Sequence, residues 1–416
     1  MVMSMPATAL LAVAVVIVVA QLVGALAERL GQPRVIGEIV GGILLGPSLL
    51  GVLAPAVEST LFAAPVRAQL HLLGQLGLVL FMFLVGVELN PRLLQGRLPL
   101  AMRITTVGVL LPLTLGVLLA KLLERWQPSL IPGEGRLDTA LFLGTAMAIT
   151  AFPVLARILR ERDLLRRPLG ALALSAAAID DVVGWTLLAT VVAYTRSGSL
   201  LGVLPPLLGT AAWAVVLIGA TRPLRRSLER RHHHRPMGPL LQTLLFGGAL
   251  FSAVVTELLG VHAIFGAFLW GLAMPRDESL HHWLELRLEA VVLRLLLPLF
   301  FAVSGLGTNI GSLDRPALWV AAALVLLVAV TGKFAGTWAM ARLSGVESKQ
   351  AQALGWLMNT RGLTELVVLN VGLELGVIST ELFTMGVLMA LITTAMTGPL
   401  LSRLGYGRLA ETPRGL

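Results

Sequence analysis

Long apolar runs, separated by short stretches rich in Arg, Pro and Gly, fill most of this chain. A helix that crosses a bilayer needs about 20 mostly apolar residues, and by that measure the runs predict about thirteen spans. The predicted fold class is therefore an all-α polytopic membrane protein. The approximate spans are 7–28, 35–53, 69–89, 98–121, 138–159, 169–194, 201–221, 239–259, 261–274, 288–309, 316–340, 351–373 and 381–403.

Composition supports a membrane protein and narrows the chemistry. Charged residues make up only 13% of the 416 residues, whereas a soluble domain carries about 25%. The chain has no Cys, which excludes disulfides, thiolate metal sites and iron–sulfur clusters. No loop between the spans is long enough to fold by itself. Residues 1–416 are therefore expected to form one transmembrane domain without a soluble regulatory domain.

The basic residues are expected to set the membrane topology. The net charge of +9 would also suit a nucleic-acid-binding protein, but these residues lie in short clusters between apolar runs, without interleaved aromatic residues. With the N-terminus outside, the predicted inner loops hold 24 of the 32 Lys and Arg residues and the outer loops hold six. Because cytoplasmic loops carry the excess of basic residues, we expect a cell-membrane protein with its N-terminus outside and its C-terminus in the cytoplasm. The expected partner of these surfaces is the lipid bilayer and not nucleic acid.

Two pairs of segments recur in the same order. Residues 39–46 (IVGGILLG) match residues 264–271 (IFGAFLWG), and residues 81–90 (FMFLVGVELN) match residues 299–309 (LFFAVSGLGTN). Such repeats predict the inverted-repeat plan of secondary transporters. The first repeat covers about 7–194 and the second about 239–404, with a connector helix at about 201–221.

Interrupted helices at equivalent places in the two repeats mark the binding site of such transporters. The fifth span contains Thr150, Phe152 and Pro153 near its middle, where proline removes a backbone donor and disfavours helix for the preceding residue. The twelfth span contains a polar sequence, Asn359 to Gly362, inside an apolar run. Both positions are predicted to be crossovers with a possible gating role.

Charged residues at bilayer depth are costly, so each is a candidate for function. Asp180 and Asp181 lie near the middle of the sixth span and Lys333 lies in the eleventh. Adjacent residues on a helix point about 100° apart, so the two carboxylates can face different partners. We expect one to face a water-filled cavity and the other to pair with Lys333.

Arg361 and Glu365 lie four residues apart on the twelfth span and can pair along one helix face. Two interpretations remain open. The pair either steadies the broken helix as a local salt bridge or takes part directly in transport.

Several of these motifs together resemble the monovalent cation:proton antiporter superfamily. The branch that they resemble most holds bacterial Kef-type and Nap-type exchangers and plant cation/proton exchangers. The resemblance covers nearly all spans in order, and its most specific part is the Asp-Asp pair with Lys333 and the two crossovers. The motifs are GEIVGGILLGPSLLG, FLVGVELNP, TAFPVLARIL, AAAIDDVVGW, GKFAG and MNTRGLTELVVLNVG.

The resemblance implies a sodium/proton antiporter-like fold, with a scaffold that forms a homodimer and a mobile core at about 98–194 and 316–404. The fifth and twelfth spans would be broken and would cross near the midplane. Asp181 matches the aspartate that binds the cation and carries the proton. Asp180 matches its neighbour that pairs with the lysine, here Lys333, and Thr150 matches the polar crossover atoms near the ion.

The expected function is therefore antiport of Na⁺ or K⁺ against H⁺ by alternating access. A carboxylate that holds either a proton or a monovalent cation exchanges the two by competition. No covalent step, enzymatic activity, cofactor or metal beyond the transported cation is expected. The alternatives are a sodium-coupled organic-solute symporter of the same fold and a non-transporting membrane sensor. An intramembrane aspartyl protease is disfavoured because its two aspartates must lie on separate helices.

Overall fold

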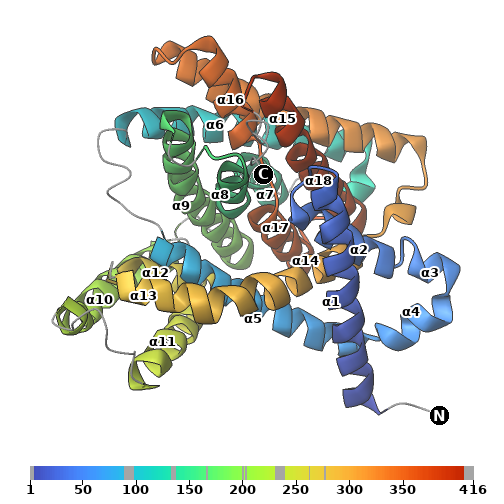
Figure 1. Cartoon of the computed structure of the whole chain (residues 1–416). Helices are drawn as coiled ribbons and strands as arrows, with labels where there is room; N and C mark the ends of the chain where they lie inside the picture. Colours follow the sequence, from blue (N-terminus) through green and yellow to red (C-terminus); the bar gives the residue numbers. More distant parts are fainter. Residues whose placement is uncertain are drawn as a thin grey trace, which may run out of the picture. The chain divides into compact units, whose positions relative to one another are not determined.

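The computed structural model describes residues 4–88, 98–132, 137–164, 167–198, 201, 204–229, 239–261, 263–275 and 278–406, and every regular element in these ranges is helical. Within them, ten helices are long and apolar enough to cross a membrane, and two shorter apolar helices accompany them. Figure 1 shows these helices with the labels used below. The all-α class predicted from the apolar runs is confirmed.

Each of the thirteen predicted spans coincides with one helix or with neighbouring helices. The helices in chain order are α1 (Met5–Arg29), α2 (Arg34–Leu45), α3 (Leu50–Leu53), α4 (Pro55–Leu61), α5 (Ala64–Glu88), α6 (Leu98–Trp126), α7 (Leu137–Ala148), α8 (Phe152–Glu161), α9 (Pro168–Ser197), α10 (Leu204–Glu229), α11 (Pro239–Leu258), α12 (Ala263–Ala273), α13 (Glu278–Leu284), α14 (Leu297–Leu306), α15 (Pro316–Leu343), α16 (Ser348–Met358), α17 (Leu363–Glu374) and α18 (Thr380–Arg403). Single 3₁₀ turns at Pro128–Leu130 and Ile310–Ser312 complete the set, and two π-helical turns at Glu285–Glu289 and Val292–Leu296 join α13 to α14.

Some boundaries differ from the sequence prediction for local reasons. The second span, predicted at 35–53, is divided because α2 ends at Leu45 before the Gly-Pro sequence at 46–47, and α3 resumes at Leu50. A proline forces the preceding residue away from helical geometry, which explains the division. The tenth span begins earlier than the predicted residue 288, since helix continues from Glu278 through the π-helical turns.

The helices form two compact units. The first comprises Met1–Gln21, Ala54–Asn90 and Ala189–Val303, and the second comprises Leu22–Leu53, Pro91–Leu188 and Ser304–Leu416. In the first unit, apolar residues of α5, α11 and α12 form one buried cluster with α13 and the π-helical turns. In the second unit, α6 packs against α7 and α15, and α18 packs against α15 and α17. Every charged candidate residue of the predicted site belongs to the second unit.

Two glycine crossings relate the segments that recur in the sequence. Inside the second unit, a Cβ on Gly305 of α14 would collide with the α2 backbone around Gly42. Inside the first unit, a Cβ on Gly271 of α12 would collide with the α5 backbone around Gly86 in the same way. Because α2 was matched with α12 and α5 with α14, the two crossings are the equivalent contacts that an inverted repeat would produce. The boundaries of the two repeats stay a prediction.

Candidate ion site at the crossed helix breaks

Two broken helices cross in the second unit. Residues 149–151 separate α7 from α8, and residues 359–362 separate α16 from α17. The Ala151 N–H donates to the Thr360 carbonyl at 3.0 Å, and the Thr150 hydroxyl donates to the Met358 carbonyl at 2.8 Å. Each break exposes backbone groups that a continuous helix would satisfy, and the two breaks satisfy part of each other's. Both predicted interruptions are therefore present and in contact.

The second break depends on a glycine. Gly362 has φ of +154° and immediately precedes α17, and a Cβ there would press against Val154 of α8. A side chain at this position would therefore be strained by the backbone and by the packing together. The Asn-Thr-Arg-Gly sequence thus ends α16 and lets the chain turn into α17 close to the first break.

Asp180 of α9 links the first break to Lys333 of α15. One carboxylate oxygen accepts the Thr150 N–H at 2.7 Å, and the other lies 2.8 Å from the Lys333 ammonium. The Lys333 ammonium also donates to the Ala148 carbonyl at the end of α7. Both side chains are 0% exposed. The structure therefore brings together the aspartate and the lysine that the sequence suggested as partners, and it adds a helix end as the third member.

Asp181 has a different environment from Asp180. Its carboxylate accepts a hydrogen bond from the Phe152 N–H, at the start of α8. Its second oxygen, Oδ1, is buried and has no hydrogen-bond partner among the described residues. Lys333 pairs with Asp180, which leaves Asp181 with one oxygen available. A helix N-terminus favours negative charge, so the start of α8 suits an anionic carboxylate or the anion–cation pair it would form.

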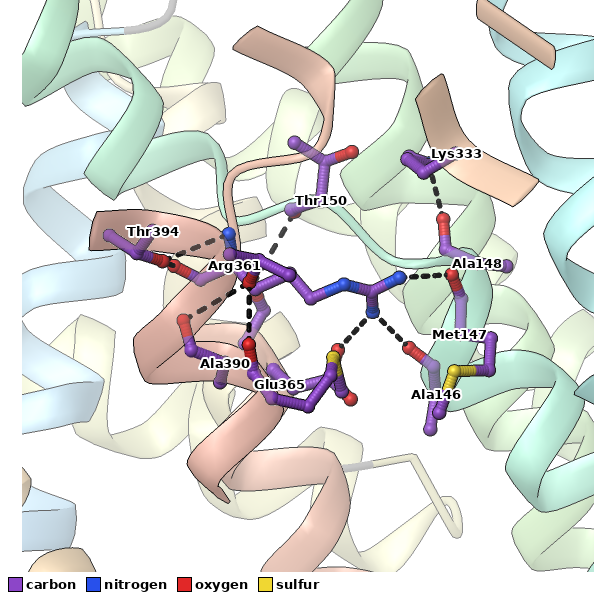
Figure 2. A network of polar contacts seen from close by, with 12 residues as sticks. Ala146, Met147, Ala148, Thr150, Lys333, Arg361, Glu365, Ala390 and Thr394 are labelled. Carbon is purple, nitrogen blue, oxygen red and sulfur yellow. Dashed lines mark hydrogen bonds and ion pairs between the residues drawn. The ribbon is translucent and has the colours of Figure 1, made fainter. Parts of the chain in front are cut away.

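Arg361, in the second break, reaches across to the first broken helix. Its guanidinium donates to the carbonyls of Ala146 and Met147 at 2.7 and 2.5 Å, and lies 2.8 Å from a Glu365 carboxylate oxygen (Figure 2). Figure 2 shows the guanidinium directed at the C-terminal turn of α7, with Lys333 above the next carbonyl, Ala148. The Arg361–Glu365 pair expected from the sequence is present, and it serves a larger contact with α7.

Thr394 of α18 is a site residue that the sequence did not single out. Its hydroxyl accepts the Arg361 N–H at 3.2 Å and donates to the Arg361 carbonyl at 2.5 Å. Thr397, one turn later, lies 3.3 Å from the Thr360 hydroxyl. The available signal was three closely spaced threonines (Thr393, Thr394 and Thr397) in a mostly apolar span opposite the second break. Polar groups in a span need internal partners, so such a cluster indicates a contact with irregular backbone.

The remaining predicted residues lie at the breaks. Phe152 is the first residue of α8 and is buried, and Pro153 follows it in the first turn. The side chain of Pro153 lies outside the described residues. Asn359 is completely buried, and both polar atoms of its amide lack a partner among the described residues.

Asp181 and Asp180 offer single carboxylates and not a cluster of metal ligands. Among the described residues, no group of three or more His, Asp or Glu side chains could hold a metal ion. The partnerless oxygen of Asp181 is therefore the candidate point of contact for a small ligand.

Comparisons with known proteins agree on one family. The family model described as sodium/hydrogen exchanger, transmembrane, matches residues 14–405. A Na⁺/H⁺ antiporter named NhaS4 from Synechocystis is 44% identical over 396 residues, which cover 94% of this chain and 95% of that protein. Cation/H⁺ antiporter 17 from Arabidopsis thaliana is 39% identical over 393 residues, 94% of this chain but 47% of that protein. The chain thus spans nearly all of the cyanobacterial relative and about half the length of the plant relative.

A solved structure shares the fold. The sodium proton antiporter MjNhaP1 from Methanocaldococcus jannaschii superposes with a TM-score of 0.69 over 96% of this chain and 97% of that one. Sequence identity is 15%, so the likeness concerns the arrangement of helices. The likeness shows an antiporter-like fold, and the family match together with the ten membrane-length helices of the described residues identifies a multi-pass membrane protein.

Proposed function

The chain belongs to the sodium/hydrogen exchanger family, and on that premise we propose that it exchanges a monovalent cation for protons by alternating access. Asp181 is the shared site, and Asp180 and Thr150 support it. Lys333 is the counter-charge, and the transported ions are Na⁺ or K⁺ and H⁺.

One observation carries this proposal. Asp181 of α9 is a buried carboxylate that contacts the start of α8 through the Phe152 N–H, and its other oxygen has no partner among the described residues. The neighbouring Asp180 already holds the only buried lysine of the described residues. A buried carboxylate oxygen without a partner is costly unless a proton or a cation binds it. Binding one excludes the other, because each neutralises the same charge. Competition at one site then couples the two fluxes.

The neighbouring groups have separate roles in this account. Asp180 is the counter-charge of the Lys333 ammonium, and it fixes the first break through the Thr150 N–H. When the cation binds or leaves, Lys333 changes its pairing or protonation, which would move a second charge and make exchange electrogenic. Phe152, Pro153 and Asn359 shape the breaks where the ion pathway opens to one side at a time.

The larger architecture is part of the same proposal. Two inverted repeats, at about 7–194 and 239–404, would supply the two breaks, and rocking of the core would expose the site to alternate sides. A homodimer in the cell membrane would hold the scaffold still during this motion. The glycine crossings of α2 with α14 and of α5 with α12 support the repeat.

Proton flux in proteoliposomes tests the function. Purified protein is reconstituted with an inside-acid pH gradient, and Na⁺, K⁺ or Li⁺ is added outside in turn. An antiporter dissipates the gradient on addition of its cation, and comparing the three cations identifies its preference. A symporter or a sensor leaves the gradient unchanged, as do protein-free liposomes. No dissipation with any of the three cations at pH 6 to 9 would overturn the proposal.

The proposed orientation has its own test. A C-terminal tag should react only in permeabilised cells or everted vesicles, because the excess of basic residues places the C-terminus in the cytoplasm. A tag that reacts on intact cells would reverse the orientation of every loop.

A further inference from the structure

The C-terminal turn of α7 is capped by two buried cationic side chains, Arg361 and Lys333. The last carbonyls of a helix lack intrahelical partners, and a helix C-terminus bears roughly half a negative charge. Three successive carbonyls of this turn accept from cationic side chains: Ala146 and Met147 from Arg361, and Ala148 from Lys333. Both cationic side chains are completely buried, so the protein itself supplies the donors for these carbonyls.

Lys333 and Arg361 differ in how readily each side chain can leave the C-terminus of α7. Lys333 is a single ammonium on a long flexible chain, and lysine can lose its proton when buried. Arg361 does not lose its proton in proteins, and its planar fork holds two carbonyls and a carboxylate at once. Glu365 fixes the guanidinium, and the Thr394 hydroxyl binds both the N–H and the carbonyl of Arg361. Arg361 is thus anchored at its backbone and at its side chain.

We propose that Arg361 is a permanent cap of the α7 C-terminus, which allows Lys333 to release Asp180 and its proton during exchange without uncapping the broken helix. Arg361 is then a positioning residue, which acts on the ion site through α7 and through its charge. Glu365 keeps it in place. This inference rests on the proposed antiport, and it gives the Arg361–Glu365 ion pair a role in that exchange.

The charged groups near Lys333 predict the direction in which each substitution shifts the protonation of this lysine. The charged groups that act on the Lys333 ammonium are Asp180 on α9, Arg361 in the second break and Glu365 on α17, and Asp181 also interacts with it. Removing the positive charge of Arg361 favours the charged lysine, since a like charge is lost and the α7 end then depends on Lys333 alone. Removing the negative charge of Glu365 disfavours the charged lysine. The two substitutions therefore act in opposite directions on the same step.

The pH dependence of exchange in proteoliposomes measures that step. We expect Arg361→Gln to move the acid limb of the pH–rate profile upward by about one unit, and Glu365→Gln to move it downward by a smaller amount. Arg361→Lys should keep the position of the limb, because the charge is retained, but should lower the maximal rate several-fold because one ammonium cannot replace the fork. Arg342→Gln, an exposed residue at the end of α15, is the matched control and should leave the profile unchanged.

The outcomes separate this inference from the proposed function. If wild-type protein does not exchange cations for protons, the function itself fails. If wild type exchanges but Arg361→Gln and Glu365→Gln lower the rate by the same factor at every pH, Arg361 only holds the fold together and the inference is wrong. Shifts in the same direction would contradict it too. Should Arg361→Gln fail to fold, Arg361→Lys and Glu365→Gln still test the inference, because each keeps a cationic donor at the C-terminus of α7. A downward shift of the acid limb in Glu365→Gln with an unshifted limb in Arg361→Lys supports the inference, and equal loss of rate at every pH in both contradicts it.

Discussion

The two helix breaks are held by different chemistry. At the first break the Thr150 N–H donates to the Asp180 carboxylate on α9, and at the second the Arg361 N–H donates to the Thr394 hydroxyl on α18. These two contacts serve the same purpose, since each satisfies one backbone N–H that the break leaves without a helical partner. A neutral hydroxyl is sufficient for that task. The carboxylate at the first break must therefore serve something more than backbone hydrogen bonding.

Charged side chains surround the first break, whereas hydroxyls bind the backbone of the second. The first break has Asp180, Asp181 and Lys333 around it, and it also receives the side chain of Arg361 from the second. The second break has the hydroxyls of Thr150, Thr394 and Thr397 as its partners. A hydroxyl carries no charge that could be exchanged, whereas the carboxylates and the ammonium around the first break do. The first break is thus suited to exchange, and the second to holding a fixed shape.

Asp181→Asn is the strongest test of the claim that the first break carries the exchange. The amide keeps the size of the side chain and can still accept the Phe152 N–H, but it cannot exchange a proton for a cation. We expect cation-driven proton flux in proteoliposomes to fall to the level of protein-free liposomes, with an unchanged melting temperature in detergent. Asp314→Asn, at an exposed position next to Arg315, is the control and should transport normally. Near-normal flux from Asp181→Asn would remove Asp181 from the site.

Lys333→Gln should have the next largest effect, mostly on stability. It leaves Asp180 buried without its counter-charge, which costs about 3–5 kcal/mol of unfolding free energy. The double variant Asp180→Asn with Lys333→Gln should be more stable than either single variant, because neither charge is left unpaired. Thermal unfolding of the purified proteins measures both effects. Two single variants as stable as wild type would show that the buried pair is not formed.

The same lysine should also determine how exchange responds to voltage. Wild-type exchange is expected to change when a membrane potential is imposed with a potassium gradient and valinomycin, using Na⁺ as the transported cation. Lys333→Gln should weaken that response because one moving charge is removed. Exchange that ignores the potential in both proteins would limit Lys333 to a structural role.

Thr394→Val should have the smallest effect and should sharpen the contrast between the breaks. Losing the hydroxyl leaves the Arg361 N–H and carbonyl without their partner, at a cost of about 1–3 kcal/mol. The cation KM and the pH profile should stay as in wild type, since no charge has changed. Thr393→Val is the matched control, because that hydroxyl bonds to carbonyls of its own helix. A shifted pH profile in Thr394→Val would place the second break in the exchange step.

The sequence was informative where one residue type has one physical meaning. Pro153 and the Asn359–Gly362 sequence marked both breaks, and lone charges in apolar runs marked Asp180 and Lys333. The partners across the breaks were much less accessible, because the Arg361–Ala146 contact joins residues 215 positions apart. Backbone carbonyls carry no sequence signal, so the capping of α7 by Arg361 could not be anticipated from the i, i+4 pairing with Glu365. The hydroxyl of Thr394 was hidden for the same reason, since its partner is backbone.

The dependence of cation KM on pH tests the central claim most directly. If cation and proton compete for the Asp181 carboxylate, the KM for Na⁺ or K⁺ in proteoliposomes should rise by up to about tenfold for each unit of falling pH, with the maximal rate at saturating cation little changed. Parallel assays at four pH values with the preferred cation are sufficient. A KM that stays constant while the maximal rate falls would mean that proton and cation occupy different sites, which would contradict exchange at a shared carboxylate.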